Sequence, residues 1–426
     1  MFLSWAKSRD GEPMFGSNND YVSSAYPASV HLVLTNLGVG IPDSKWVSMK
    51  LKDLQQSGSL HGTSRSSAWY SDLAKVILSP GISTWHSTYV SELRNIPLIP
   101  LSDGQWSVAP TASNPIYFPQ SLGARIPSGL PLTLVEEEAV RCDHRRELFE
   151  LLGVKDCDAG NIVKEIIRYH ERFTRASHID IVGHAKYLYH VKDKLKGDDM
   201  KNIYFAATDE RHFYKGYRLY MEDLPSTELT ELFSTYEDAL FLDSDYFQDL
   251  NGMETRLFKN WLKSTAGIAT VPRFKTQPDA LHADFRWLLN NRNDHVLGII
   301  RRYWDIYSSQ VTSSIKREIA DYSFLCQTQN AVPLRQCFIP LPNLVEHSRE
   351  LCGSDSCSFL TLSGGLPSDW RFLAEFDVGT EDNLDFYLWI LKQPGFKANP
   401  SVERAKKLYL EIQSRAGSNA EKVKVR

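Results

Sequence analysis

Several features are scarce in this chain of 426 residues, and each scarcity excludes a class of protein. Six cysteines are too few for a disulfide scaffold. No apolar run approaches the roughly 18 residues that cross a bilayer. Charge of one sign is also lacking: 48 basic and 52 acidic side chains leave a formal net charge of −4. A nucleic-acid-binding surface normally makes a domain strongly basic, so we expect neither a membrane nor a nucleic acid as the main partner.

Targeting and modification signals are missing as well. The start of the chain lacks the charged-then-apolar layout of a secretory signal. No Asn-x-Ser/Thr site with a non-proline middle residue occurs. We therefore predict a cytoplasmic protein, with the nucleus as the alternative, whose thiols are reduced and mostly buried.

Catalytic signatures are absent too. The chain has no Gly-x-Ser-x-Gly elbow for a serine nucleophile. Gly364-Gly365 precedes Leu366-Pro367 and lacks the Gly-Lys-Ser/Thr of a phosphate loop, so it indicates a turn. The sequence predicts no catalytic residue, no cofactor-binding residue and no metal ligand.

A recurring helix ending is the most informative feature that is present. An apolar helical pattern runs into Gly38, Gly153, Gly267 or Asp377, and a β-branched residue follows each time. Glycine suits the left-handed position just past a helix end. The β-branched residues Val39, Val154, Ile268 and Val378 are 115, 114 and 110 residues apart. This spacing predicts an internal repeat of about 112 residues.

The segments between these endings have a common order. Amphipathic helices come first, for example over 162–173, 181–195, 279–290, 296–307 and 383–391. A β-like block follows, at 97–106 with an Asp-Gly turn and 116–119, at 203–206 with 217–220, and at 324–326 with 337–342. Then come a loop and the capped helix. The predicted fold class is therefore α+β, helix-rich, in tandem units. The predicted boundaries are 1–39 (N-terminal segment), 40–154, 155–268, 269–378 and 379–426 (a partial unit with a disordered tail).

These residues resemble a known family. The stretch from Ile96 to Trp106, the segment Ile116-Tyr117-Phe118-Pro119 and the helix from Arg145 to Val154 are similar to the large sacsin / NO VEIN-like proteins. Residues 370–391 extend the similarity. In that family a Bergerat-type ATPase module precedes long helical and mixed regions, so the resemblance implies chaperone-associated or scaffolding work.

The chain departs from the family at the nucleotide site. The ATPase module needs an Asp-x-Gly-x-Gly loop, and only Asp377-Val378-Gly379-Thr380-Glu381 comes near, without its second glycine. We interpret that segment as one of the helix endings. The chain thus resembles a non-catalytic part of such a protein.

Other polar groups receive structural interpretations. His347, Cys352 and Cys357 lie five residues apart, which is not the spacing of a zinc site. His178, His184 and His190 recur every six residues and would spread around a helix. Glu136, Glu137 and Glu138 are expected to begin a helix at about 140–152. The basic residues of two small clusters are expected to form surface salt bridges: Arg141, His144, Arg145, Arg146, Arg301 and Arg302.

The predicted function is a non-catalytic protein-interaction or chaperone-associated scaffold that binds protein partners, with no prediction of its oligomeric state. The alternative is an enzyme, hydrolytic or nucleotide-binding, with a site assembled between the tandem units.

Overall fold

The computed structural model describes residues 14–15, 22, 26–40, 43–61, 65–78, 87–172, 177–196, 199–209, 212–222, 228–276, 278–352, 357–393, 396–397 and 401–416. The disordered tail that the sequence predicts at the end of 379–426 lies outside these residues. The chain forms two compact lobes. The first lobe comprises residues 1–206 and 244–261, and the second comprises 207–243 and 262–426.

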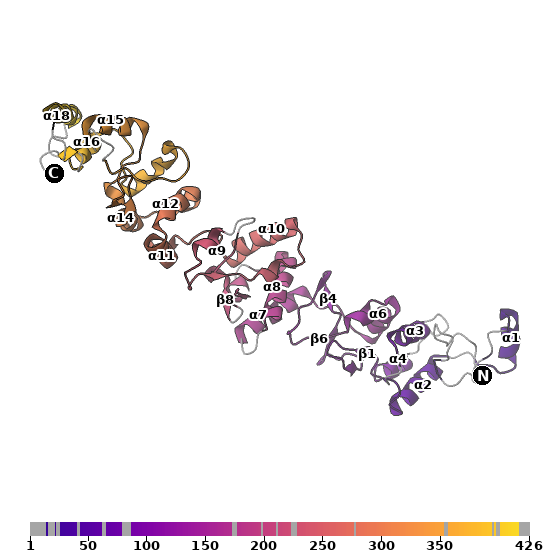
Figure 1. Cartoon of the computed structure of the whole chain (residues 1–426). Helices are drawn as coiled ribbons and strands as arrows, with labels where there is room; N and C mark the ends of the chain where they lie inside the picture. Colours follow the sequence, from indigo (N-terminus) through magenta and orange to yellow (C-terminus); the bar gives the residue numbers. More distant parts are fainter. Residues whose placement is uncertain are drawn as a thin grey trace. The chain divides into compact units, whose positions relative to one another are not determined.

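Helices predominate in the first lobe (Figure 1). Side-chain caps explain two of their starts: Asp43 accepts a hydrogen bond from the amide of Trp46 at 2.8 Å, and Ser66 accepts one from the amide of Trp69 at 3.2 Å. The helices are α1 (Ala28–Asn36), α2 (Ser44–Gln56), α3 (Ser67–Ile77), α4 (Ser87–Leu93), α5 (Glu137–Val140), α6 (Asp143–Leu152), α7 (Ala159–Arg172), α8 (His178–His190) and α10 (Gly252–Trp261).

Strands of the first lobe are only two or three residues long. They are β1 (Ile99–Pro100), β2 (Trp106–Ser107), β3 (Ile116–Tyr117), β4 (Gln120–Ser121), β5 (Ala124–Arg125), β6 (Thr133–Leu134) and β7 (Tyr204–Ala206). β1 and β2 form the hairpin that the Asp-Gly turn predicts. α3 and α6 pack against each other (Figure 1) and bury Leu73, Ile77, Leu148 and Phe149 in one apolar cluster.

One predicted helix of this lobe is wrong in its extent. The segment expected as a single helix at about 140–152 is divided into α5 and α6. Cys142 lies between them with extended backbone angles (φ −91°, ψ 115°), and this residue ends the first helical turn before the second begins. A two-helix arrangement allows α6 to align with α3 independently of the α5 direction.

The second lobe repeats this mixture of helices and very short strands. Its strands are β8 (Phe213–Lys215), β9 (Leu219–Tyr220), β10 (Leu240–Phe241), β11 (Lys275–Thr276), β12 (Ala280–Leu281), β13 (Ser323–Leu325) and β14 (Ala331–Pro333). Its α-helices are α9 (Glu228–Leu232), α11 (Ala283–Asn291), α12 (Asn293–Arg302), α13 (Trp304–Tyr307), α14 (Ser313–Asp321), α15 (Pro342–Cys352), α16 (Leu384–Ile390) and α18 (Val402–Ala416). A 3₁₀ helix spans Pro367–Phe376. The chain is therefore a helix-rich α+β protein.

The sequence predicts residues 217–220 as the second strand of a hairpin, and this prediction is wrong. Gly216–Arg218 is a 3₁₀ turn, and β9 after it pairs in parallel with β10. The backbone at Gly216 approaches the carbonyl oxygen of Ala266 so closely that a Cβ there would lie 2.3 Å from it. This contact holds the chain in the turn and directs Leu219 and Tyr220 toward β10.

A small bridged arrangement of backbones occurs at three places. In each, a central residue forms two parallel bridges. One partner lies later in the chain, before the capped helix, and the other lies just after that helix. The three sets are Tyr117 with Leu134 and Lys155, Tyr220 with Phe241 and Ala269, and Phe338 with Phe359 and Gly379. Three antiparallel bridges stand beside them, namely Leu101 with Val135, Ala207 with Leu242, and Cys326 with Leu360.

The capped helix ends have the backbone conformation that the sequence predicts. The values of φ at Gly38, Gly153, Gly267 and Asp377 are 87°, 104°, 72° and 62°. The next amide then bonds back to the helix five residues earlier, as in Val39 to Leu34 at 2.9 Å and Val154 to Phe149 at 2.9 Å. Ile268 bonds six residues back, to Leu262, because Leu262–Ala266 forms a π-helical turn.

Among the helices of the described residues, none combines the length and apolar content needed to cross a bilayer.

Candidate functional site

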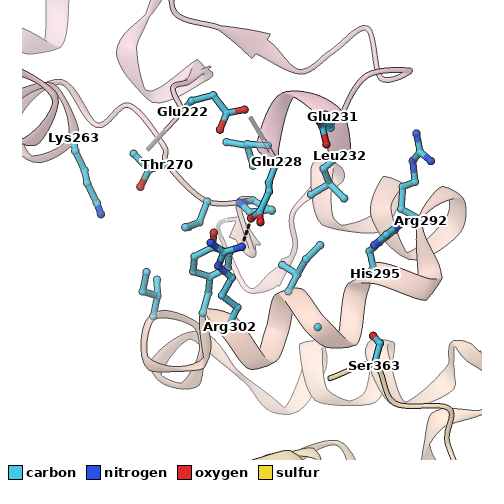
Figure 2. A pocket seen from close by; sticks show the side chains of 17 residues that line it. Glu222, Glu228, Glu231, Leu232, Lys263, Thr270, Arg292, His295, Arg302 and Ser363 are labelled. Carbon is cyan, nitrogen blue, oxygen red and sulfur yellow. Dashed lines mark hydrogen bonds and ion pairs between the residues drawn. The ribbon is translucent and has the colours of Figure 1, made fainter. Parts of the chain in front are cut away.

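A groove of about 820 Å³ opens in the second lobe beside α9 and α12 (Figure 2). Five segments that are distant in sequence line it, which is why no sequence motif marks it. The lining residues are Glu222, Glu228, Leu229, Glu231, Leu232, Lys263, Thr270, Val271, Pro272, Arg292, His295, Gly298, Ile299, Arg302, Tyr303, Ile306 and Ser363.

Hydrogen bonds hold two of its walls. The Glu222 carboxylate accepts from the amide of Thr230 at 2.5 Å, so the segment after β9 is tied to α9. The carbonyl oxygen of Pro272 accepts from the buried hydroxyl of Tyr307 at 2.8 Å. The surface of α12 is open at Gly298, where an added Cβ would meet nothing within 4 Å.

Charges of both signs line the groove. Glu228 and Arg302 form an ion pair, drawn as a dashed line in Figure 2, with side chains that are 62% and 54% exposed. Such exposure limits the pair to about 0–1 kcal/mol, so a ligand can displace it at little cost. Figure 2 shows Lys263 at one end of the groove and Arg292 with His295 at the other. Arg292 also donates to the Ser234 hydroxyl at 3.3 Å.

Apolar surface lies between these charges. Leu229 and Leu232 of α9 line the groove together with Ile299 of α12 and with Tyr303, the residue after α12. Arginine and aromatic side chains with an apolar centre and a charged rim are typical of surfaces that bind proteins. The groove is thus chemically suited to a polypeptide segment.

A buried carboxylate lies deeper in the same lobe. Asp284 is 6% exposed and accepts hydrogen bonds from Tyr220, from Arg273 Nη1 at 3.2 Å and from Tyr236 at 3.4 Å. Burial works to raise the pKa of Asp284, but hydrogen bonds from His282 and Tyr220 and the charge of Arg273 outweigh it, so the pKa is lowered. Burial and the Asp284 charge raise the pKa of Tyr236 to about 12. The network holds β9 against α11 and its charge is fully partnered.

A buried histidine pair occupies the first lobe. His184 Nδ1 lies 3.2 Å from His170 Nε2, and the amide of Tyr204 donates to His170 Nδ1 at 3.2 Å. The neutral His170 therefore carries its proton on Nε2 and donates to His184, whose own proton is on Nε2. Burial lowers the pKa of His170 to about 3 and that of His184 to about 4.

The three histidines of α8 contact different partners. His184 faces His170, His178 Nδ1 lies 3.7 Å from Asp245, and His190 Nε2 lies 2.9 Å from the carbonyl oxygen of Leu122. His347, Cys352 and Cys357 likewise contact different partners. His347 pairs with Asp382 at 3.2 Å, whereas the sulfur atoms of Cys352 and Cys357 lie 3.0 Å apart.

One arginine of the first basic cluster is not a surface residue, contrary to the sequence prediction. Arg145 is 4% exposed, donates to Ser67 at 3.1 Å and lies over the rings of Tyr70 and Phe149. Its burial follows from the packing of α6 on α3, which the sequence alone does not reveal. Arg141 and Arg146 do form surface ion pairs, with Glu138 at 2.7 Å and Glu150 at 3.2 Å.

The second basic cluster serves two contacts. Arg302 reaches Glu228 in the groove, and Arg301 lies over the ring of Trp370 and donates to the carbonyl oxygen of Gly364 at 2.5 Å. Gly364 and Gly365 have φ values of 74° and 75°, as a glycine turn requires.

The near-match to a nucleotide loop is part of the fold. Asp377 ends the 3₁₀ helix and pairs with Lys316 at 3.0 Å. Gly379 exchanges backbone hydrogen bonds with Cys337 and Ile339 at 2.9 Å and 3.0 Å.

No protein-family model, curated protein or solved structure matches this chain.

Proposed function

We propose that the chain is a non-catalytic, chaperone-associated protein-interaction scaffold, built from tandem units of about 112 residues. It resembles the repeat region of sacsin / NO VEIN-like proteins. In this proposal the units span 40–154, 155–268 and 269–378, with a partial unit at 379–426.

The observation that carries the proposal is one set of backbone hydrogen bonds that occurs three times. In each set the carbonyl oxygen of the central residue accepts a hydrogen bond from a later amide. These bonds run from Val135 to Tyr117 at 3.0 Å, from Leu242 to Tyr220 at 2.8 Å and from Leu360 to Phe338 at 3.0 Å. Amides of the residues after the central one donate to the strand past the capped helix: Phe118 to Lys155 at 3.0 Å, Met221 to Ala269 at 2.9 Å and Ile339 to Gly379 at 3.0 Å.

The spacing of these contacts supports a common ancestry of the units. The central residues Tyr117, Tyr220 and Phe338 are 103 and 118 residues apart, and Lys155, Ala269 and Gly379 are 114 and 110 apart. Hydrogen bonds of one pattern that recur at intervals of similar length are expected of a duplicated supersecondary unit.

The groove beside α9 and α12 is the surface that we assign to a partner protein. Its mixed charges and apolar floor fit a polypeptide, and the Asp377–Gly379 segment is engaged in backbone pairing, which argues against nucleotide binding there.

Cross-linking tests this assignment. Lys263 lines the groove, so a lysine-reactive cross-linker applied to the tagged protein in a lysate of its source cells should join Lys263 to a partner. Gly298→Leu adds an isobutyl group to the groove at a position where a Cβ meets nothing within 4 Å, and it should reduce this cross-link at least fivefold. Gly252→Leu is the matched control, because a Cβ at residue 252 also meets nothing within 4 Å. An unchanged Lys263 cross-link in Gly298→Leu would contradict the groove assignment. ATP hydrolysis that Gly379→Ala abolishes would contradict the non-catalytic proposal.

A further inference from the structure

Two thiols of the second lobe are in direct contact. Cys352 ends α15, Cys357 precedes the bridged residues Phe359 and Leu360, and their sulfur atoms lie 3.0 Å apart. The side chains are 0% and 2% exposed, within the core cluster of this lobe. A disulfide requires about 2.05 Å, so a small χ rotation at either cysteine brings the atoms to bonding distance.

The surroundings favour a thiolate at Cys352. The thiol of Cys357 hydrogen-bonds to it and lowers the pKa of Cys352, burial opposes this, and the charge of Arg404 acts in the same direction as the hydrogen bond. A thiolate is the form that attacks an oxidant.

We propose that Cys352 and Cys357 are a redox modification site, which a small hydroperoxide converts into an intramolecular disulfide. The near-complete burial of both side chains selects a small, uncharged oxidant such as hydrogen peroxide over a bulky disulfide.

The chemistry balances in two steps. The Cys352 thiolate attacks one peroxide oxygen, the O–O bond breaks, and the products are a Cys352 sulfenic acid and hydroxide, which takes up a proton to become water. Cys357 sulfur then attacks the sulfenic sulfur, the S–S bond forms, the S–O bond breaks, and a second water leaves. Two thiols lose two electrons and one peroxide gains them. A dithiol reductant reverses the change by thiol–disulfide exchange.

A second cysteine pair in the same lobe provides an internal comparison. Cys326 and Cys337 are also buried, but their sulfur atoms lie 3.7 Å apart, and Cys337 Sγ lies 3.4 Å from the carbonyl oxygen of Pro333. Forming a bond there requires a longer movement and breaks that contact. We expect this pair to need at least tenfold more peroxide for half oxidation.

The arrangement of cleavage sites makes the measurement direct. Cys352 and Cys357 lie in one tryptic peptide between Arg349 and Arg371, whereas Arg335 separates Cys326 from Cys337. The folded full chain is titrated with hydrogen peroxide, denatured, alkylated with iodoacetamide and digested. The expected product is a 350–371 peptide that carries no alkyl group and has lost two hydrogens, and dithiothreitol pretreatment before alkylation should restore both alkyl groups.

Variants identify the attacking sulfur. In Cys357→Ser, Cys352 should accumulate as a sulfenic acid that dimedone traps, and Cys142→Ser should leave the 350–371 disulfide unchanged. The proposal is overturned if Cys352 and Cys357 both stay reduced, and are therefore alkylated, at the peroxide concentration that oxidises the partly exposed Cys142. Oxidation to sulfinic or sulfonic acid alone, or bonding of either cysteine elsewhere, also overturns it. The wild-type titration decides between these results even if a variant fails to fold.

Discussion

The backbone of Gly379 lies against the ring of Phe338, and a Cβ at residue 379 would stand 2.0 Å from Cε1 of that ring. The Phe338 ring cannot easily retreat, because it packs on Trp389 at 4.7 Å and Phe386 at 5.3 Å between centroids. We therefore expect Gly379→Ala to destabilise the second lobe by about 2–3 kcal/mol through overpacking, measured by urea unfolding.

Gly298→Ala is the matched control for that change. Residue 298 is inside α12, where the added methyl has free space, and alanine is the better helix former by about 0.5–1 kcal/mol. The control should be neutral or stabilising. Equal urea midpoints for Gly379→Ala and the wild type would mean that the contact with Phe338 does not restrict residue 379.

The helix ends could be predicted from the sequence because they depend on neighbouring residues only. Gly153 needs no partner to favour φ of 104°, and the apolar residues of α6 repeat at helical spacing. The α+β, helix-rich class and most helices follow from such patterns. The hairpin of β1 and β2 follows from its Asp-Gly turn, but a strand such as Gln120–Ser121 could not be predicted, because two residues are too short for an alternating pattern.

Contacts between distant segments explain why the sequence prediction for Arg145 was wrong and why the groove was not predicted. Arg145 looks like a surface charge in sequence, and its burial depends on Ser67, which is 78 residues away. The groove depends on Glu222 and Ser363, which lie at the two ends of a long stretch of chain. The sequence carries neither contact as a motif, since both arise only when the lobes fold.

The left-handed helix ends give a paired prediction. Gly153→Ala places a Cβ at φ of 104° and should cost about 1–2 kcal/mol. Asp377→Gly removes the same kind of strain at φ of 62° and should stabilise by up to about 1 kcal/mol. The second change also removes an exposed ion pair with Lys316, so it is measured in 0.5 M salt, where that pair is screened. A stabilising Gly153→Ala would argue against the strain at these ends.

Protonation of the buried histidine pair should weaken the first lobe in mild acid. Burial lowers the pKa of His170 to about 3 and of His184 to about 4, below the roughly 6.5 of the unfolded chain. The stabilisation from neutral histidines is complete above pH 6.5 and is lost as the pH falls toward 4, because the unfolded state then binds more protons. Linkage gives about 2 kcal/mol for each histidine between pH 7.5 and pH 5.

The control separates this effect from other titrations. His170→Phe should unfold at lower urea concentration at pH 7.5 but lose less stability on acidification than the wild type does. His190→Gln, which changes a surface histidine, should keep the wild-type slope. Parallel slopes for all three proteins would show that the pair does not titrate with unfolding.

Removal of the Asp284 carboxylate should be far more damaging than removal of an exposed one. Asp284 is buried and neutralises Arg273, which also donates to the carbonyl oxygen of Leu219 at 2.7 Å and lies over the Tyr220 ring. Asp284→Ala leaves that guanidinium without its counter-charge and should cost about 3–5 kcal/mol in urea unfolding of the second lobe. Asp279→Ala breaks the Lys275 ion pair of 2.6 Å at the surface, where solvent screens it, and should leave the urea midpoint close to that of the wild type. Asp284→Ala with Arg273→Met should recover part of the loss, because the unpaired charge is then gone. If the double variant is no more stable than Asp284→Ala, the cost comes from the lost tyrosine hydrogen bonds and not from Arg273.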